Sequence, residues 1–80
     1  MHIDIARHTI RKSFQVSREL GDTLQFLKEK CEPEEYQRYA IDIATAIHTV
    51  QAALLDSAIK SYPELEQEIE SQIATYDRYL

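Results

Sequence analysis

The sequence predicts an all-α protein: two long antiparallel helices forming a hairpin, plus a shorter third helix, assembled into a dimeric helical bundle. The 80-residue chain is short enough to be one domain, residues 1–80, and it holds only one glycine and two prolines. Both prolines are followed directly by glutamate, as expected where a helix begins. No stretch alternates apolar and polar residues with the period of two that a half-buried strand requires.

The first helix is predicted over residues 4–30. Lys28 and Lys30 stand before the first proline, and a helix C-terminus favours cations. Gly21 is the ambiguous position, because a glycine followed by Asp22 can end one helix and begin another. The apolar spacing passes through Gly21 without a shift, which favours one long helix, straight or bent there. The positions that keep this spacing of three and four are Ile3, Ala6, Ile10, Ser13, Ser17, Leu20, Leu24, Leu27 and Cys31.

The second helix is predicted over residues 33–60 and the third over residues 63–79. Pro33 suits a first helical turn, because its missing N–H would be unpaired there in any residue. Ser61 and Glu64 have the spacing of a capping box, with Ser61 as the N-cap of the third helix. A single narrow apolar stripe follows the third helix and indicates one packing surface. It consists of Tyr62, Leu65, Ile69, Ile73, Tyr76 and Leu80.

The second helix carries apolar residues on two roughly opposed sides when each residue is placed about 100° from the last. The main stripe consists of Tyr36, Ala40, Ile43, Ile47, Val50 and Leu54. The second stripe consists of Ile41, His48, Ala52, Leu55 and Ile59. Two neighbours in so small a monomer cover one broad face of a helix but not two opposed faces. The second stripe is therefore predicted to be the interface with a second copy or another protein, and two-fold dimers are the commonest oligomers.

Charge is divided unevenly along the chain, whose formal net charge is -5. Residues 1–30 carry six Lys/Arg against four Asp/Glu, whereas residues 31–80 carry three against ten. The candidate contact edges are a basic one on the first helix and an acidic one on the third. They consist of Arg7, Arg11 and Arg18, and of Glu66, Glu70 and Asp77. Pairing of the two edges, within or between chains, is favoured over nucleic-acid contact, because the net charge repels a polyanion.

No group of residues predicts catalysis, a bound metal or a cofactor. His48 has no strong metal ligand three or four positions away, since those positions are Ala44, Thr45, Gln51 and Ala52. We interpret it as an interface histidine, whose protonation near pH ~6 would loosen a dimer. Cys31 is the only cysteine, which excludes a disulfide framework and indicates a reducing, cytoplasmic compartment. No apolar run is long enough to span a membrane.

These features predict a non-enzymatic protein that acts through protein–protein contact, as a homodimeric adaptor, regulator or small chaperone. The alternative is an acidic inhibitor of the antitoxin or immunity type, which would bind a basic protein through the second stripe and the acidic edge. A nucleic-acid binder that uses the first helix is less favoured, and an enzyme or metalloprotein is least favoured. No cofactor is expected, and the first partner expected is a second copy of the chain.

Overall fold

The computed structural model describes residues 2–80, and within them every regular element is helical. Helix α1 spans Ile3–Lys30 and helix α2 spans Pro33–Val50. The π-helical segment η1 (Gln51–Asp56) and helix α3 (Ser57–Ser61) continue α2 without interruption. Helix α4 spans Glu64–Tyr76. Counted as continuous rods, these elements are three helices, so the predicted all-α class is confirmed for the described residues.

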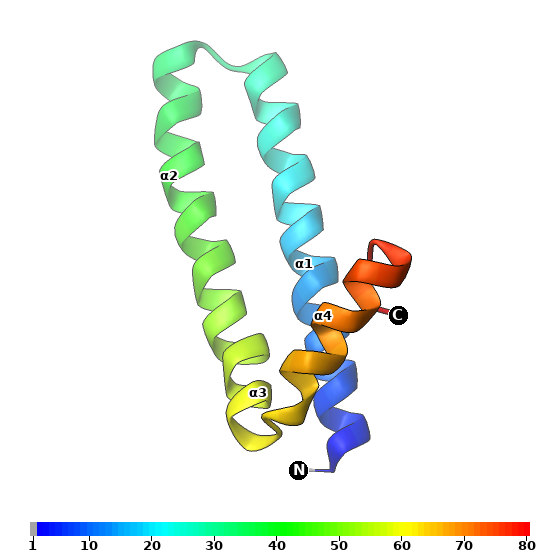
Figure 1. Cartoon of the computed structure of the whole chain (residues 1–80). Coiled ribbons are helices and arrows are strands. Elements are labelled where there is room, and N and C mark those ends of the chain that lie inside the picture. The colour runs from blue at the N-terminus through cyan, green and yellow to red at the C-terminus, as the bar shows by residue number, and fades with distance from the viewer. Residues whose placement is uncertain (1) are drawn as a thin grey trace.

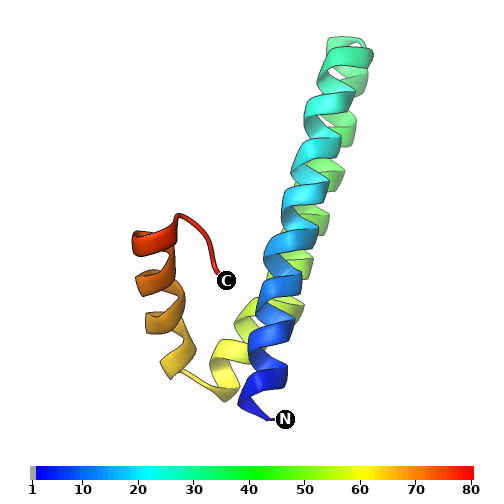
Figure 2. The same cartoon turned by 90° about the vertical axis from the view of Figure 1, so that its right-hand side faces the viewer.

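The first two rods lie side by side and run in opposite directions, and α4 folds back across one face of the pair (Figures 1 and 2). Figure 2 shows that α4 reaches only part of the way along this face and that the opposite face carries no helix. The principal dimensions of the molecule are 44 × 25 × 15 Å. The molecule is therefore two layers of helix where α4 covers the hairpin and a single layer beyond the end of α4.

The buried core lies at the end of the hairpin that α4 covers. Its apolar members come from three helices, and further half-buried side chains pack around them. The core consists of Ala6 and Ile10 of α1, Ala58 of α3, and Leu65 and Ile69 of α4. Ser13 is also fully buried, and its hydroxyl has no hydrogen-bond partner among the described residues. In contrast, α2 has no fully buried residue at all.

Helix α1 is continuous through Gly21, as the unshifted apolar spacing predicts. At its end, the Cys31 N–H donates to the Leu27 carbonyl at 2.8 Å, and the chain then turns into α2. Pro33 begins α2 as predicted. Glycine has a low helix propensity, so the helix-forming residues on either side carry α1 through Gly21.

We expect Gly21→Ala to raise the free energy of unfolding by about 1 kcal/mol, because alanine has the higher helix propensity. The structure offers room for the change, since a Cβ at Gly21 would have no other atom within 4 Å and the glycine does not have a positive φ. Urea denaturation followed by far-UV circular dichroism measures the change. An unchanged or lower stability would contradict the open surroundings of Gly21.

The capping box predicted at Ser61 is wrong. Ser61 is the last residue of α3, and the Tyr62 N–H still donates to the Ala58 carbonyl at 2.9 Å. The carbonyls of Tyr62 and Pro63 accept from the first N–H groups of α4, at 3.0 and 3.2 Å, and no side chain caps the helix. The backbone carbonyls of Tyr62 and Pro63, and not the Ser61 hydroxyl, therefore accept the hydrogen bonds from the start of α4.

The third helix also ends earlier than the predicted residue 79. It stops at Tyr76 because Asp77 adopts a left-handed conformation, φ 60°, and its N–H donates to the Ile73 carbonyl at 2.9 Å. Aspartate tolerates this conformation better than most residues other than glycine. The chain then returns toward α1, and the Leu80 N–H donates to the Gln72 side chain at 2.8 Å.

Candidate interaction sites

The residues of the predicted second stripe do not share one surface. Ile41 is 68% exposed, and His48 and Ala52 are also exposed. Leu55 and Ile59 are half-buried and pack against the core of the same chain. The expectation that all five lie on one unpartnered stripe is therefore wrong for Leu55 and Ile59, although the use of the exposed three as an interface remains a prediction.

The π-helical segment is the physical reason for this difference. A π turn holds more residues than an α turn, so the side chains within the segment and after it are rotated relative to a straight α-helix. The Ser57 hydroxyl donates to the Ala52 carbonyl five residues earlier, at 3.2 Å, within this widened turn. The rotation carries Leu55 and Ile59 from the outer side of the rod toward α1 and the core.

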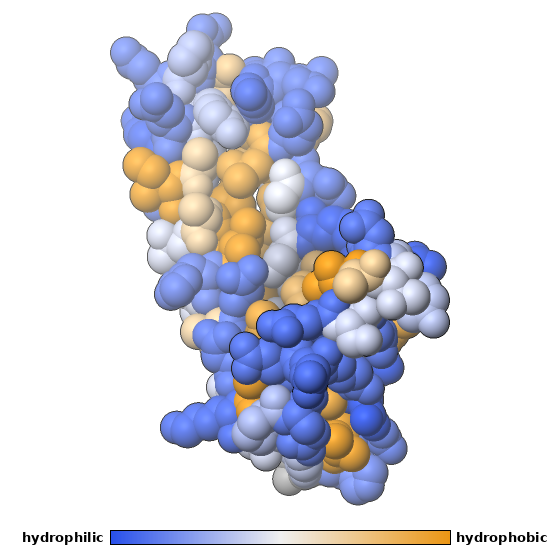
Figure 3. Space-filling model, in the orientation of Figure 1, coloured by the Kyte–Doolittle hydropathy of each residue, from blue (hydrophilic) through white to orange (hydrophobic). Residues whose placement is uncertain are grey.

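An apolar seam runs between α1 and α2 beyond the reach of α4. Its residues recur every three or four positions on the facing sides of the two helices, and each is only half-buried. They are Leu20, Leu24 and Leu27 of α1 and Ala40, Ile43, Ile47 and Val50 of α2. Figure 3 shows apolar side chains along this line beyond the end of α4. Two helices alone do not remove such a seam from water.

The position of a residue relative to the seam indicates which face of the hairpin it occupies, since each step along a helix turns by about 100°. Phe14 follows the buried Ser13 and lies on the face that carries α4, where its ring contacts Tyr79. Residues that precede a buried or seam position lie on the opposite face. Because α1 and α2 are antiparallel, the same rule holds for both helices.

We name the side of the hairpin away from α4 the uncharged face. Lys12, Glu19 and Asp42 precede Ser13, Leu20 and Ile43 and place three charges on this side. Uncharged residues that precede buried or inward-facing positions give the face its name. They are Ile5, Thr9, Val16 and Thr23 of α1 and Tyr39 and Ala46 of α2. Ile5 is 56% exposed and Tyr39 is 48% exposed. The hydroxyls of Thr9 and Thr23 donate to carbonyls of their own helix, at 2.9 and 3.0 Å, so their polar groups are already satisfied.

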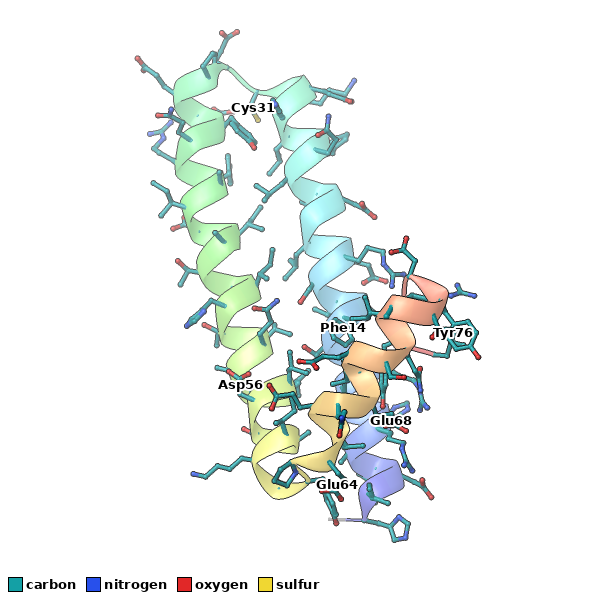
Figure 4. The ribbon with its side chains drawn as sticks, in the orientation of Figure 1. Phe14, Cys31, Asp56, Glu64, Glu68 and Tyr76 are labelled. Carbon is teal, nitrogen blue, oxygen red and sulfur yellow. The ribbon has the colours of Figure 1, made fainter. Side chains whose placement is uncertain are left out.

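Glu68 joins α4 to both α1 and the C-terminal segment (Figure 4). The Arg7 Nε donates to both carboxylate oxygens of Glu68, at 3.2 Å each, and Arg7 Nη1 donates to Asp4 at 2.9 Å. The Tyr79 hydroxyl donates to Glu68 Oε2 at 3.0 Å. The hydrogen bond to Glu68 raises the pKa of Arg7 above its usual value.

The predicted pairing of the basic and acidic edges is made, but by a different carboxylate. Glu66 and Glu70 are exposed and make no ion pair with another described residue, whereas Glu68 binds Arg7. Arg11 lies over the Tyr79 ring, with its guanidinium carbon 5.6 Å from the ring centroid. Of the six candidate edge residues, the structure brings only Arg11, Arg18 and Asp77 together.

These three line a cavity of about 250 Å³ between α1 and the end of α4. The other lining residues are one arginine, Arg78, and three apolar or aromatic residues, Phe14, Ile73 and Tyr79. The tilted rings of Phe14 and Tyr79, with centroids 6.1 Å apart, form its aromatic part. Three guanidiniums and one carboxylate give the lining a positive charge on an otherwise acidic protein.

We expect Tyr79 to titrate above its ordinary pKa of about 10. Burial raises this pKa, and the hydrogen bond to the Glu68 carboxylate raises it further. Since the folded-state pKa lies above the unfolded one, the phenol stabilises the fold below pH ~10 and the stabilisation is lost as pH rises through the folded-state pKa. A tyrosinate absorbance titration of the native chain, minus that of Tyr79→Phe, measures this one group among five tyrosines. A difference curve centred at the ordinary value would contradict the contact with Glu68.

Cys31 lies at the turn between α1 and α2 (Figure 4). A hydrogen bond to Glu35 raises the pKa of its thiol, and burial raises it further, so the reactive thiolate is disfavoured. Among residues 2–80, no three or more His, Cys, Asp or Glu side chains are grouped in a way that could hold a metal ion. What these arrangements can do chemically is bind: an apolar partner on the hairpin and an anion at the arginine-lined cavity.

Sequence reasoning missed Glu68, Arg78 and Tyr79 as site residues. Glu68 stands beside the core residue Ile69 and three positions after Leu65, which is a weak signal that it points toward α1. The positions of Arg78 and Tyr79 depend on the left-handed turn at Asp77, and no glycine marks that turn in the sequence.

No family model, curated protein or solved structure matches the chain. No helix within the described part of the chain has the length and apolar character needed to cross a membrane. Inference about function therefore depends on the surfaces described above.

Proposed function

We propose that this protein is a non-enzymatic interaction protein that acts as a homodimer, with the uncharged face of each hairpin covered by that of a second copy. The observation that supports the proposal is this face, which runs the length of the hairpin on the side away from α4. It exposes Ile5 and Tyr39, carries three charged residues of mixed sign, Lys12, Glu19 and Asp42, and borders a seam that is only half-buried.

The size of the face suits a self-complementary interface. The 28 residues of α1 span about 42 Å, and two helices side by side are about 20 Å wide, so the face measures roughly 800 Å². A standard protein–protein interface buries about 800 Å² per partner. Two such hairpins packed face to face form a four-helix arrangement, in which the half-buried seam residues become a shared core.

A second copy is favoured over a different partner because the charges on the face are few and of both signs, Lys12 against Glu19 and Asp42, so they do not select a partner of one charge. Charged rims commonly steer and select unlike partners, whereas apolar, satisfied surfaces such as that of Thr9 and Thr23 are typical of homodimer cores. The exposed acidic residues of α4, Glu66 and Glu70, lie outside this face and remain available for a basic partner. Such a partner is the second candidate function, as an acidic inhibitor.

The test uses three consecutive exposed positions of α2. Ala46→Glu places a charge on the uncharged face, Ala44→Glu places the same charge on the face that carries α4, and Thr45→Glu places it on the outer side. Light scattering over a dilution series gives the solution mass of each variant, and circular dichroism gives its helicity. We expect the native chain, Ala44→Glu and Thr45→Glu to be dimers and Ala46→Glu to be a monomer of unchanged helicity.

The other outcomes separate the alternatives. If Ala44→Glu dissociates and Ala46→Glu does not, the dimer uses the side on which Ile41 and His48 lie, as the sequence predicts. If the native chain is a monomer at every concentration, the homodimer is wrong, and binding of a basic protein becomes the leading function.

A further inference from the structure

We propose that the arginine-lined cavity between α1 and the C-terminal segment binds a phosphomonoester dianion whose ester group carries a single ring. The cavity is separate from the uncharged face, because Phe14 and the arginines of α1 lie on the side that carries α4. The proposal concerns a ligand site and does not depend on the oligomeric state.

The charge of the lining matches a dianion. Arg11, Arg18 and Arg78 line the cavity and Asp77 is the only carboxylate among the lining residues, which leaves a net charge of +2. None of these arginines makes an ion pair with another described residue. Arg7 differs, because Asp4 and Glu68 already occupy its guanidinium. The protein thus neutralises one arginine of α1 and leaves the two that line the cavity, Arg11 and Arg18, without a carboxylate partner.

The spacing of the arginines suits one phosphate group. Arg11 and Arg18 are seven residues apart on one side of α1, a separation of about 10 Å along the helix axis. Arg78 approaches the same cavity from the C-terminal segment, beyond α4. Guanidinium groups bind phosphate oxygens in pairs with good geometry, which is why arginine is preferred over lysine at such sites.

The remaining walls suit a ring. Phe14, Ile73 and Tyr79 supply an aromatic and aliphatic surface beside the guanidiniums, and Arg11 is itself stacked over the Tyr79 ring. A cavity of 250 Å³ is smaller than the roughly 300–1,000 Å³ of drug-sized sites, so one ring and one phosphate are the expected scale. The ligand class that fits both the arginines and the aromatic and aliphatic wall is an aryl phosphate or a similar ring-bearing phosphomonoester.

The experiment titrates the full chain with phenyl phosphate by isothermal calorimetry and by NMR. Inorganic phosphate keeps the dianion without the ring, and benzenesulfonate keeps the ring with one charge. We expect phenyl phosphate to bind about tenfold more tightly than either, and Arg18→Gln and Arg78→Gln each to weaken it about tenfold, the effect of losing ~1.4 kcal/mol. Both arginines are exposed, so neither change should alter the fold. Arg38→Gln, at an exposed arginine of α2 outside the cavity, is the matched control and should bind normally.

A short peptide with one phosphotyrosine and neutral flanks distinguishes the two sources of this chemistry. Tighter binding of the peptide than of phenyl phosphate assigns the site to a phosphorylated protein, and equal or weaker binding assigns it to a small metabolite. The proposal is overturned if phenyl phosphate shows no saturable binding, if benzenesulfonate binds as well, or if Arg38→Gln weakens binding as much as the two cavity variants.

Discussion

Leu65→Ala is expected to lower the free energy of unfolding by about 3 kcal/mol, within the range of roughly 2–5 kcal/mol for leucine truncated to alanine in a core. Leu65 is only 1% exposed, and together with Ile69 it is the buried apolar contact of α4 with the rest of the chain. Its loss leaves a cavity where α1, α3 and α4 meet. Urea denaturation followed by circular dichroism measures the change.

Ile73→Ala is the matched control, because it removes a similar side chain two turns further along the same apolar stripe. Ile73 is 42% exposed, so we expect a loss below about 1 kcal/mol. Equal losses at the two positions would mean that α4 docks along its whole stripe, as the sequence predicts, rather than through its first two turns.

Glu68→Ala is expected to detach the C-terminal segment and to weaken the docking of α4. The carboxylate accepts from Arg7 of α1 and from the Tyr79 hydroxyl, so one truncation removes both links. Loss of a hydrogen bond to a charged group costs about 1.5–3 kcal/mol, and we expect the lower end because the Glu68 side chain is 30% exposed. The pKa of Tyr79 should fall toward its ordinary value in the same variant, since one of the causes that raise it is removed.

Glu70→Ala provides the comparison, since it makes the same substitution in the same helix at an exposed glutamate with no ion pair among the described residues. Its stability and the Tyr79 titration should stay at the native values. A larger loss at Glu70 than at Glu68 would show that the acidic edge predicted from the sequence is the one that holds α4, and would contradict the Arg7–Glu68 contact.

The proposed anion site depends on the same docking. The cavity lies between α1 and the residues that end α4, so a variant that releases α4 should also lose phenyl phosphate binding. Leu65→Ala is therefore a structural test of the site that touches none of its lining residues. The uncharged face carries no residue of α4, so the dimer should survive wherever the hairpin stays folded.

Local chemistry made the helices predictable. The prolines, the lysines before them and the unshifted apolar spacing through Gly21 act within a few residues of chain, so they indicate the helices and most of their ends correctly. The same reasoning names Arg11, Arg18 and Asp77 as candidate contact residues, but it does not predict that they line one cavity. Their meeting depends on where the chain turns after Tyr76.

The sequence by itself therefore determines an all-helical chain with an apolar main side on each helix and a division into a basic and an acidic part. Only the tertiary structure decides the π segment that turns Leu55 and Ile59 inward, the left-handed turn at Asp77, and the choice of Glu68 over Glu66 and Glu70. Each of these is a local difference from the straight α-helices that the sequence predicts. Packing against α1 selects it, and a helical projection at a constant 100° per residue contains no information about that packing.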